Sequence, residues 1–100
     1  MMKKYIVREN RGEAKVGASL DEIENTILEG DPYEVARFDT PEEADAYLAA
    51  HPGKVTREKT FYNFDVLEIE GCFWEEVELD EDGEEVAWGD MEYCEFKEEA

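Results

Sequence analysis

Basic side chains are scarce in this chain, and the shortage limits what it can bind. Of the 100 residues, 10 are Lys or Arg and 29 are Asp or Glu, which gives a net charge of −19. Nucleic acids and anionic membrane surfaces are both bound mainly through Lys and Arg. The sequence therefore predicts no direct binding to nucleic acid or membrane, and it leaves basic proteins and metal cations as partners.

Side chains for nucleophilic and acid–base catalysis are almost absent. His51 is the single histidine and stands at a predicted helix end, so we expect it to cap or pack. Ser19 is the single serine, occupies a helix-capping position and has no G-x-S-x-G context. The glycines are isolated and form no phosphate-binding loop. These absences predict a non-enzymatic protein with no catalytic residue and no cofactor.

Long apolar runs are also missing. None approaches the roughly 20 residues that cross a bilayer, and residues 1–8 lack the apolar core of a signal peptide, so we expect a cytoplasmic protein. Cys72 and Cys94 match no metal-ligand spacing and are interpreted as free thiols rather than a disulfide framework. They become neighbours if Gly89-Asp90 forms a bulge that shifts the strand pairing. A cross-strand disulfide is the alternative at that position.

The content of apolar residues is nevertheless that of a folded protein. Hydrophobic residues make up 42% of the chain and 12% of the residues are aromatic. A chain of this length supports one core. We therefore expect a single domain over residues 1–100, with a frayed tail at 97–100.

Two helix starts are marked by capping residues. Ser19 followed by Glu22 fits a capping box ahead of an apolar stripe. Thr40 is an N-cap, Pro41 takes the first helical position, and Glu43 closes the second box. The acidic residues of these first turns are explained by capping and by the helix dipole.

The rest of the chain has a composition typical of strands. Segments rich in β-branched and aromatic residues lie at 3–8, 33–38, 55–59 and 61–70, with a turn at 9–12 and a hairpin around Asp82-Gly83. The order β-α-β-α followed by strands predicts an α+β fold. We expect an antiparallel sheet of about four to five strands with two short helices on one face.

The hairpin register predicts an acidic sheet face. A two-residue type I′ turn at Asp82-Gly83 pairs Leu79 with Val86 and Val77 with Trp88. Side chains alternate along a strand, so Phe73, Val77 and Leu79 form one apolar face. The opposite face is then the predicted partner-binding surface, with Trp74 as an aromatic anchor. Its residues are Trp74, Glu76, Glu78, Asp80 and Glu85, extended by Glu68 and Glu70.

Calcium binding is an alternative for the run from Asp80 to Glu85. The EF-hand loop requires glycine at its sixth position and a bidentate Glu at its twelfth. Here Gly83 stands fourth and Met91 stands twelfth. We therefore interpret the run as a hairpin turn and predict no metal site.

The negative charge is concentrated near the C-terminus. Residues 1–67 hold 14 acidic and 9 basic residues, a net of −5, whereas residues 68–100 hold 15 and 1, a net of −14. Carboxylates on one strand face repeat at about 6.8 Å, and DNA phosphates advance about 3.4 Å per nucleotide. Such a row fits a basic groove built for nucleic acid. Adaptation to high salt spreads charge evenly, and simple solubility needs no partner.

The segment from Phe38 to Ala44 and the hairpin from Asp80 to Glu84 resemble parts of small uncharacterised proteins of bacterial phages and mobile elements. In size and charge the chain is similar to anti-CRISPR proteins and other DNA-mimic inhibitors. That resemblance implies an inhibitor that occupies the basic groove of a nucleic-acid-binding enzyme, such as a CRISPR effector nuclease. An acidic structural or assembly protein and a divalent-cation-binding module are the alternatives, and no oligomeric state is predicted.

Overall fold

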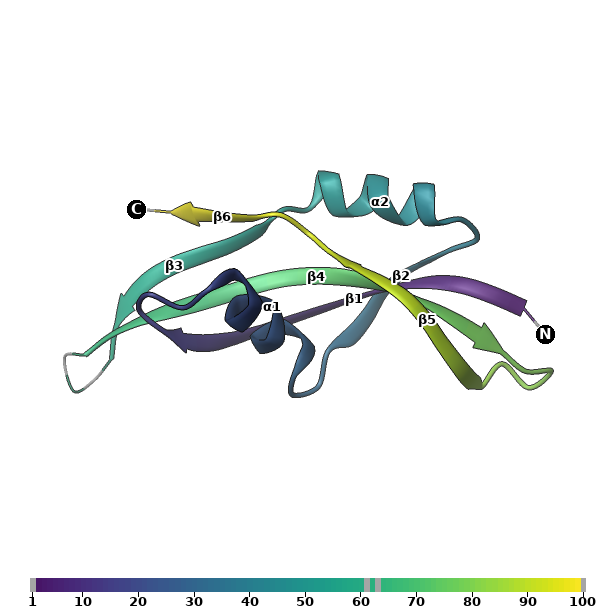
Figure 1. The fold of residues 1–100 in the computed structure, drawn as a ribbon, viewed down its shortest axis with the longest axis horizontal. Coiled ribbons are helices and arrows are strands. Elements are labelled where there is room, and N and C mark those ends of the chain that lie inside the picture. The colour runs from purple at the N-terminus through teal and green to yellow at the C-terminus, as the bar shows by residue number, and fades with distance from the viewer. Residues whose placement is uncertain (1, 61, 63, 100) are drawn as a thin grey trace.

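Two long antiparallel strands form the centre of the protein. The structure is a computed structural model that describes residues 2–60, 62 and 64–99. Strand β1 (Met2–Lys15) pairs with β4 (Asp65–Leu79) from Met2 opposite Leu79 to Lys15 opposite Val66, without a register shift. In Figure 1 these strands run along the whole length of the molecule.

The other strands attach to the edges of this pair. Strand β2 (Tyr33–Phe38) pairs with β1, while β3 (Gly53–Lys59) and β5 (Glu85–Tyr93) pair with successive parts of β4. Strand β6 (Phe96–Glu99) pairs with β3, so the described residues form a six-stranded sheet. The molecule is elongated, with extents of 51 × 23 × 19 Å.

The two helices cover opposite faces of the central strands. Helix α1 (Leu20–Leu28) buries Ile23 and Ile27 with Ile69 and Phe73. Helix α2 (Pro41–Ala50) buries its apolar side chains with Cys72 and Trp74, which alternate with Phe73 along β4. The predicted α+β class is confirmed, but the prediction of both helices on one face is wrong. Consecutive apolar residues at 72–74 place apolar side chains on both faces, and each face needs a cover.

The local helix signals are confirmed. Ser19 Oγ accepts the Glu22 backbone N–H at 3.2 Å, and Glu22 reaches back to the Ser19 N–H at 3.4 Å. Thr40 Oγ1 accepts the Glu43 N–H at 3.3 Å. His51 caps the C-terminus of the second helix, as expected. No helix among the described residues has the length and apolar content needed to cross a membrane.

Two strand boundaries differ from the prediction. Strand β1 continues through residues 9–12, where a turn was expected, because β4 extends far enough to pair with them. Gly12 permits close packing there, since a Cβ at this position would lie 2.7 Å from the Thr26 methyl group. Strand β4 begins at Asp65 rather than at 61. Phe61 and Asn63, which belong to the predicted strand, lie outside the described residues.

The sheet is mixed, and the predicted all-antiparallel sheet of four to five strands is wrong. Strands β3 and β5 are both antiparallel to β4, so the chain that continues from β5 alongside β3 must run parallel to β3. This continuation is β6, which includes residues 97–99 of the expected frayed tail. The Gly53 N–H donates to the Glu95 carbonyl at 2.7 Å where the chain changes partner.

Phe96 packs above two glycines at this junction. A Cβ on Gly71 would lie 2.5 Å from the Phe96 ring, and one on Gly53 would lie 2.6 Å from it. The ring also contacts both buried clusters. The absence of side chains at Gly53 and Gly71 therefore creates the space that lets β6 join the sheet.

We predict that Gly71→Ala lowers the free energy of unfolding by about 1–2 kcal/mol, because the added methyl overlaps the Phe96 ring. Urea denaturation measures the change. In a Phe96→Ala background the same substitution should cost clearly less, since the obstacle is gone. Purely additive effects in this double-mutant cycle would contradict the packing described.

Candidate functional site

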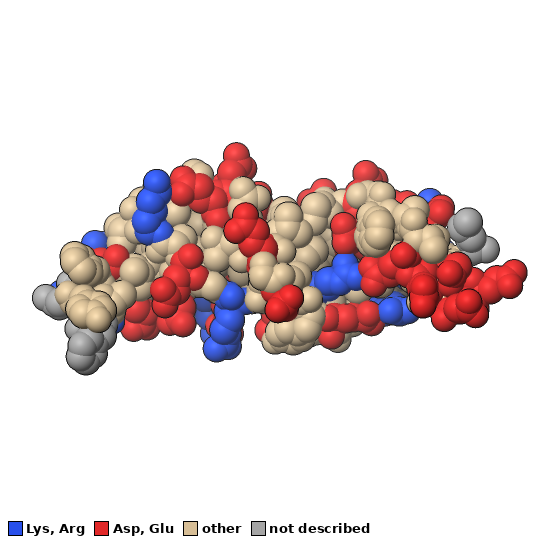
Figure 2. Space-filling model, turned by 90° about the horizontal axis from the view of Figure 1, so that it is seen from below, with Lys and Arg blue, Asp and Glu red and all other residues tan. Residues whose placement is uncertain are grey.

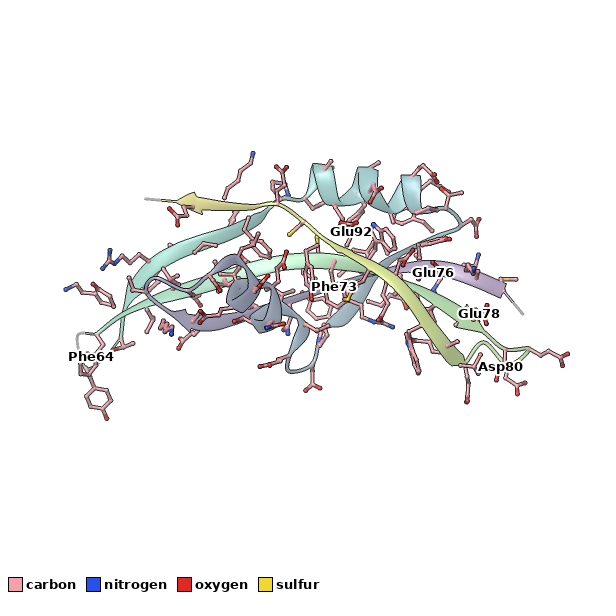
Figure 3. The ribbon with its side chains drawn as sticks, in the orientation of Figure 1. Phe64, Phe73, Glu76, Glu78, Asp80 and Glu92 are labelled. Carbon is pink, nitrogen blue, oxygen red and sulfur yellow. The ribbon has the colours of Figure 1, made fainter. Side chains whose placement is uncertain are left out.

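The acidic arm, defined as residues 75–88, comprises the end of β4, a turn and the start of β5. It has no Lys or Arg, and its acids are Glu75, Glu76, Glu78, Asp80, Glu81, Asp82, Glu84 and Glu85. Figure 2 shows acidic side chains gathered at the end of the molecule where this hairpin lies. Figure 3 shows Glu76, Glu78 and Asp80 following one another along β4 towards the tip.

The turn of the arm is built around Asp80. The Gly83 N–H donates to the Asp80 carbonyl, and the Asp80 N–H donates to the Glu84 carbonyl, both at 3.0 Å. The Asp80 carboxylate accepts the N–H groups of Asp82 and Glu84 at 2.9 and 3.0 Å. Gly83 has a positive φ, in the left-handed region that favours glycine. The loop therefore contains three residues, 81–83, and the predicted two-residue type I′ turn is wrong.

This longer loop changes the strand register by one residue. Leu79 lies opposite Glu85 rather than Val86. A bulge follows at Val86, and the predicted pairing of Val77 with Trp88 is confirmed beyond it. Glu85 consequently lies on the same face as Leu79, and Glu76 and Glu78 point to the other face.

The prediction that all these acids share one face with Trp74 is therefore wrong. Trp74 is 5% exposed beneath α2, and its indole N–H donates to Asp45 at 2.7 Å. It cannot be an aromatic anchor for a partner in this conformation. Its burial follows from the helix packing on this face, which the strand pattern alone does not reveal.

Glu68 and Glu70 lie on the face of Glu76 but do not extend its acidic surface. Cys72 and Trp74 interrupt the column and are covered by α2. At about 3.4 Å per residue, Glu70 and Glu76 are separated by roughly 20 Å along the strand. Glu70 also pairs with Arg11 on β1.

Cations from β1 neutralise the base of the arm. Arg8 contacts Glu75 at 2.8 Å and Glu85 at 2.6 Å, and its side chain is 15% exposed. Trp88 Nε1 donates to Glu85 at 3.0 Å. Burial acts to raise the pKa of Glu85, but hydrogen bonds from Trp88 and Arg8 and the Arg8 charge lower this pKa overall.

Lys3 contributes a further contact on the other face of the arm, where it contacts Glu76 at 2.9 Å. Four acids nearer the tip have no ion pair with the Lys or Arg residues that the structure describes, namely Glu78, Glu81, Asp82 and Glu84. The last three are exposed. The negative charge of the arm is thus balanced at its base and unbalanced at its tip.

An exposed aromatic residue on the arm was not expected from the sequence. Trp88 is 59% exposed and Val86 is 46% exposed. Trp88 lies beside Glu85 on the face of Leu79, and Val86 occupies the bulge. Trp88 was expected to be part of the apolar core face. Its position opposite Val77 is as predicted, but no helix among the described residues covers this end of the sheet.

No group of three or more His, Cys, Asp or Glu side chains within the described part of the chain is arranged to hold a metal ion. Comparisons with protein-family models, with curated proteins and with solved structures gave no match. The similarity to phage and DNA-mimic proteins therefore rests on size, charge and organisation alone.

We predict that Arg8→Met lowers the free energy of unfolding at pH 7 by about 1–3 kcal/mol, the usual cost of leaving a hydrogen-bonded group without its partner. Glu75 and Glu85 lose their shared cation in this variant. The folded-state pKa of Glu85 is below its ordinary value of 4.5, so the ion-pair stability is present above pH 4.5. It is lost as pH falls through the folded-state pKa. The difference between wild type and variant should shrink below pH 4.5.

Arg37→Met is the matched control, since Arg37 forms an exposed pair with Glu34 within one strand. Pairs of this kind contribute about 0–1 kcal/mol. Urea denaturation over a pH series measures both variants. Equal losses in the two variants, or a loss in Arg8→Met that does not depend on pH, would refute the role given to Arg8.

Proposed function

We propose that this chain is a non-enzymatic protein-binding module that inserts its acidic arm into a basic groove of a nucleic-acid-binding protein and inhibits it. The observation that carries the proposal is the set of four tip acids without a neutralising cation among the described residues. Like charges this close raise the energy of the isolated hairpin. A groove lined with Lys and Arg relieves this repulsion and also its own.

The overall charge suits the same class of partner. Duplex DNA carries one negative charge per about 1.7 Å, or about 30 charges over a length equal to this molecule. The protein has 29 acidic residues over its 51 Å length. A groove that attracts the DNA backbone electrostatically therefore attracts this protein as well.

The arrangement of acids favours a groove over a flat surface. Glu85 and Glu78 lie on opposite faces of the arm, and Glu81, Asp82 and Glu84 lie at or beside its turn. A flat partner would contact one face and leave the other in water. A channel contacts both, as the DNA-binding channels of CRISPR effectors, restriction enzymes and DNA-binding regulators do.

Solubility alone explains acids but not the apolar groups beside them. Trp88 and Val86 expose apolar surface on the same arm as the unpaired carboxylates. Interfaces commonly have an aromatic residue at the centre and polar residues around it. We therefore assign the role of aromatic anchor to Trp88 in place of Trp74.

Assembly through a sheet edge is the second candidate, because the outer edge of β5 has no strand partner within the described residues. Two register shifts interrupt β5, and several acids flank it. Bulges and charges of this kind oppose edge-to-edge pairing. The geometry therefore favours the groove-binding proposal.

We predict that neutralising the tip abolishes partner capture. The variant carries Glu78→Gln, Glu81→Gln, Asp82→Asn and Glu84→Gln, which removes the charges that face the groove. Immobilised protein is exposed to lysate at increasing salt, and the captured protein is then tested for binding of a duplex oligonucleotide. Wild type should capture a partner whose DNA binding it inhibits, with affinity that falls steeply as salt rises.

The matched control neutralises four exposed acids outside the arm, namely Glu13, Asp31, Glu58 and Glu95. Both variants change the net charge from −19 to −15, because each loses four of the 29 acids. The control should retain capture and inhibition. Equal capture by the two variants would reject the arm as the binding site.

We also predict that Trp88→Ala weakens partner binding at least about 30-fold, as expected for a hot-spot aromatic residue worth about 2 kcal/mol. Titration calorimetry with the captured partner measures the affinity. Leu20→Ala is the control, because Leu20 is also 59% exposed but lies on α1. A change below threefold at Trp88 would remove it from the interface.

A further inference from the structure

Cys72 and Cys94 lie opposite one another at the base of the arm, where the chain leaves β4. The Cys94 N–H donates to the Cys72 carbonyl at 3.0 Å, and the Cys72 N–H donates to Cys94 Sγ at 3.4 Å. Opposed residues in antiparallel strands have Cα atoms about 4.5–5.5 Å apart, and disulfides span about 4.4–6.8 Å. The strand geometry therefore suits a bond between the two sulfurs.

A bulge creates this juxtaposition. Glu75 pairs with Met91 and Val77 with Trp88, so β5 has one extra residue in the region of Gly89-Asp90. The sequence predicts that the cysteines become neighbours if a bulge forms at this place, and the bulge is present. Both cysteines are free thiols in the structure.

The two thiols have opposite acidities. The Cys72 thiol hydrogen-bonds to Cys94, and this contact, with backbone N–H groups, lowers the pKa of Cys94 to about 7 although burial opposes it. The same hydrogen bond and burial raise the pKa of Cys72. Cys72 Sγ also lies 3.5 Å from the His51 carbonyl, to which it can donate. Cys94 therefore has the character of a nucleophile and Cys72 that of a proton donor.

Small molecules can approach both sulfurs although each side chain is almost buried. Cys94 is 4% exposed and lines an open cavity of about 290 Å³ beside Leu48 and Pro52. Cys72 is 3% exposed and lines a second cavity of about 340 Å³ beside His51. A hydroperoxide is small enough to enter such cavities, whereas a second protein molecule is not.

We propose that Cys72 and Cys94 are a thiol modification site in which a hydroperoxide oxidises Cys94 and Cys72 then closes an intramolecular disulfide. The Cys94 thiolate attacks the peroxide O–O bond, gives a sulfenic acid, and releases an alcohol or water after proton uptake. The Cys72 sulfur then attacks the Cys94 sulfur and displaces water, with the Cys72 proton leaving in that water. The two thiols lose two hydrogens in total, and one peroxide is reduced.

The bond would close the chain around the whole acidic arm. Residues 72 and 94 are 22 positions apart, and residues 75–88 lie between them. A link at this place fixes the end of β5 to β4 at the base of the hairpin. The modification needs no partner, so its test is independent of the groove-binding proposal.

The first experiment uses the unmodified chain. Reduced, folded protein is treated with hydrogen peroxide at pH 7 and analysed by intact mass and peptide mapping. We expect the loss of two hydrogens, a cross-link between the peptides that contain Cys72 and Cys94, and a melting temperature raised by roughly 10 °C until dithiothreitol is added. Intermolecular disulfides, over-oxidation of Cys94 without a cross-link, or no reaction of the folded chain would overturn the proposal.

The second experiment separates the roles of the two thiols. In Cys72→Ala, a dimedone probe should trap a sulfenic acid at Cys94, because nothing resolves it. In Cys94→Ala, Cys72 should remain reduced at the same peroxide concentration. The pH midpoint for alkylation of Cys94 should lie near 7 in wild type and move higher in Cys72→Ala. Equal reactivity of the two single-cysteine variants, or an unmoved midpoint, would contradict the assignment.

Discussion

The long ladder between β1 and β4 determines the shape of this protein. Strand β4 has 15 residues and helix α2 has 10. A strand also rises more than twice as far per residue as a helix does, so β4 is several times longer than α2. Two helices on opposite faces therefore cover the middle of the ladder and cannot cover its ends. The acidic arm is exposed because it belongs to the uncovered part of a strand that is much longer than the helices.

Local signals in the sequence were sufficient for the helices but not for the strands. Ser19 with Glu22, and Thr40 with Pro41, specify helix starts through contacts within four residues. Strand lengths depend on partners far away in the chain. The segment 9–12 has the composition of a turn, yet pairing with β4 holds it extended. The parallel strand β6 depends on the space above two glycines, which no periodicity reveals.

The candidate site was predictable to within one residue of register, and that residue decides the outcome. Val77 opposite Trp88 was correct, whereas Asp80 closes a three-residue loop and moves Glu85 opposite Leu79. Because side chains alternate, this shift places Glu85 on the other face. The sequence also could not show which tryptophan is exposed, since Trp74 is buried by a helix that had been expected on the same face as α1.

The same ladder explains why charge remains unbalanced at the tip. Lys3 and Arg8 stand on β1 and reach Glu75, Glu76 and Glu85 because β1 lies directly beside β4. The pairing ends at Met2 opposite Leu79, so beyond Leu79 no neighbouring strand of the described chain supplies cations. Screening by water and salt is then the remaining source of relief within the described residues. A cation of a partner protein gains most by binding where intramolecular neutralisation stops, which is the turn of the arm.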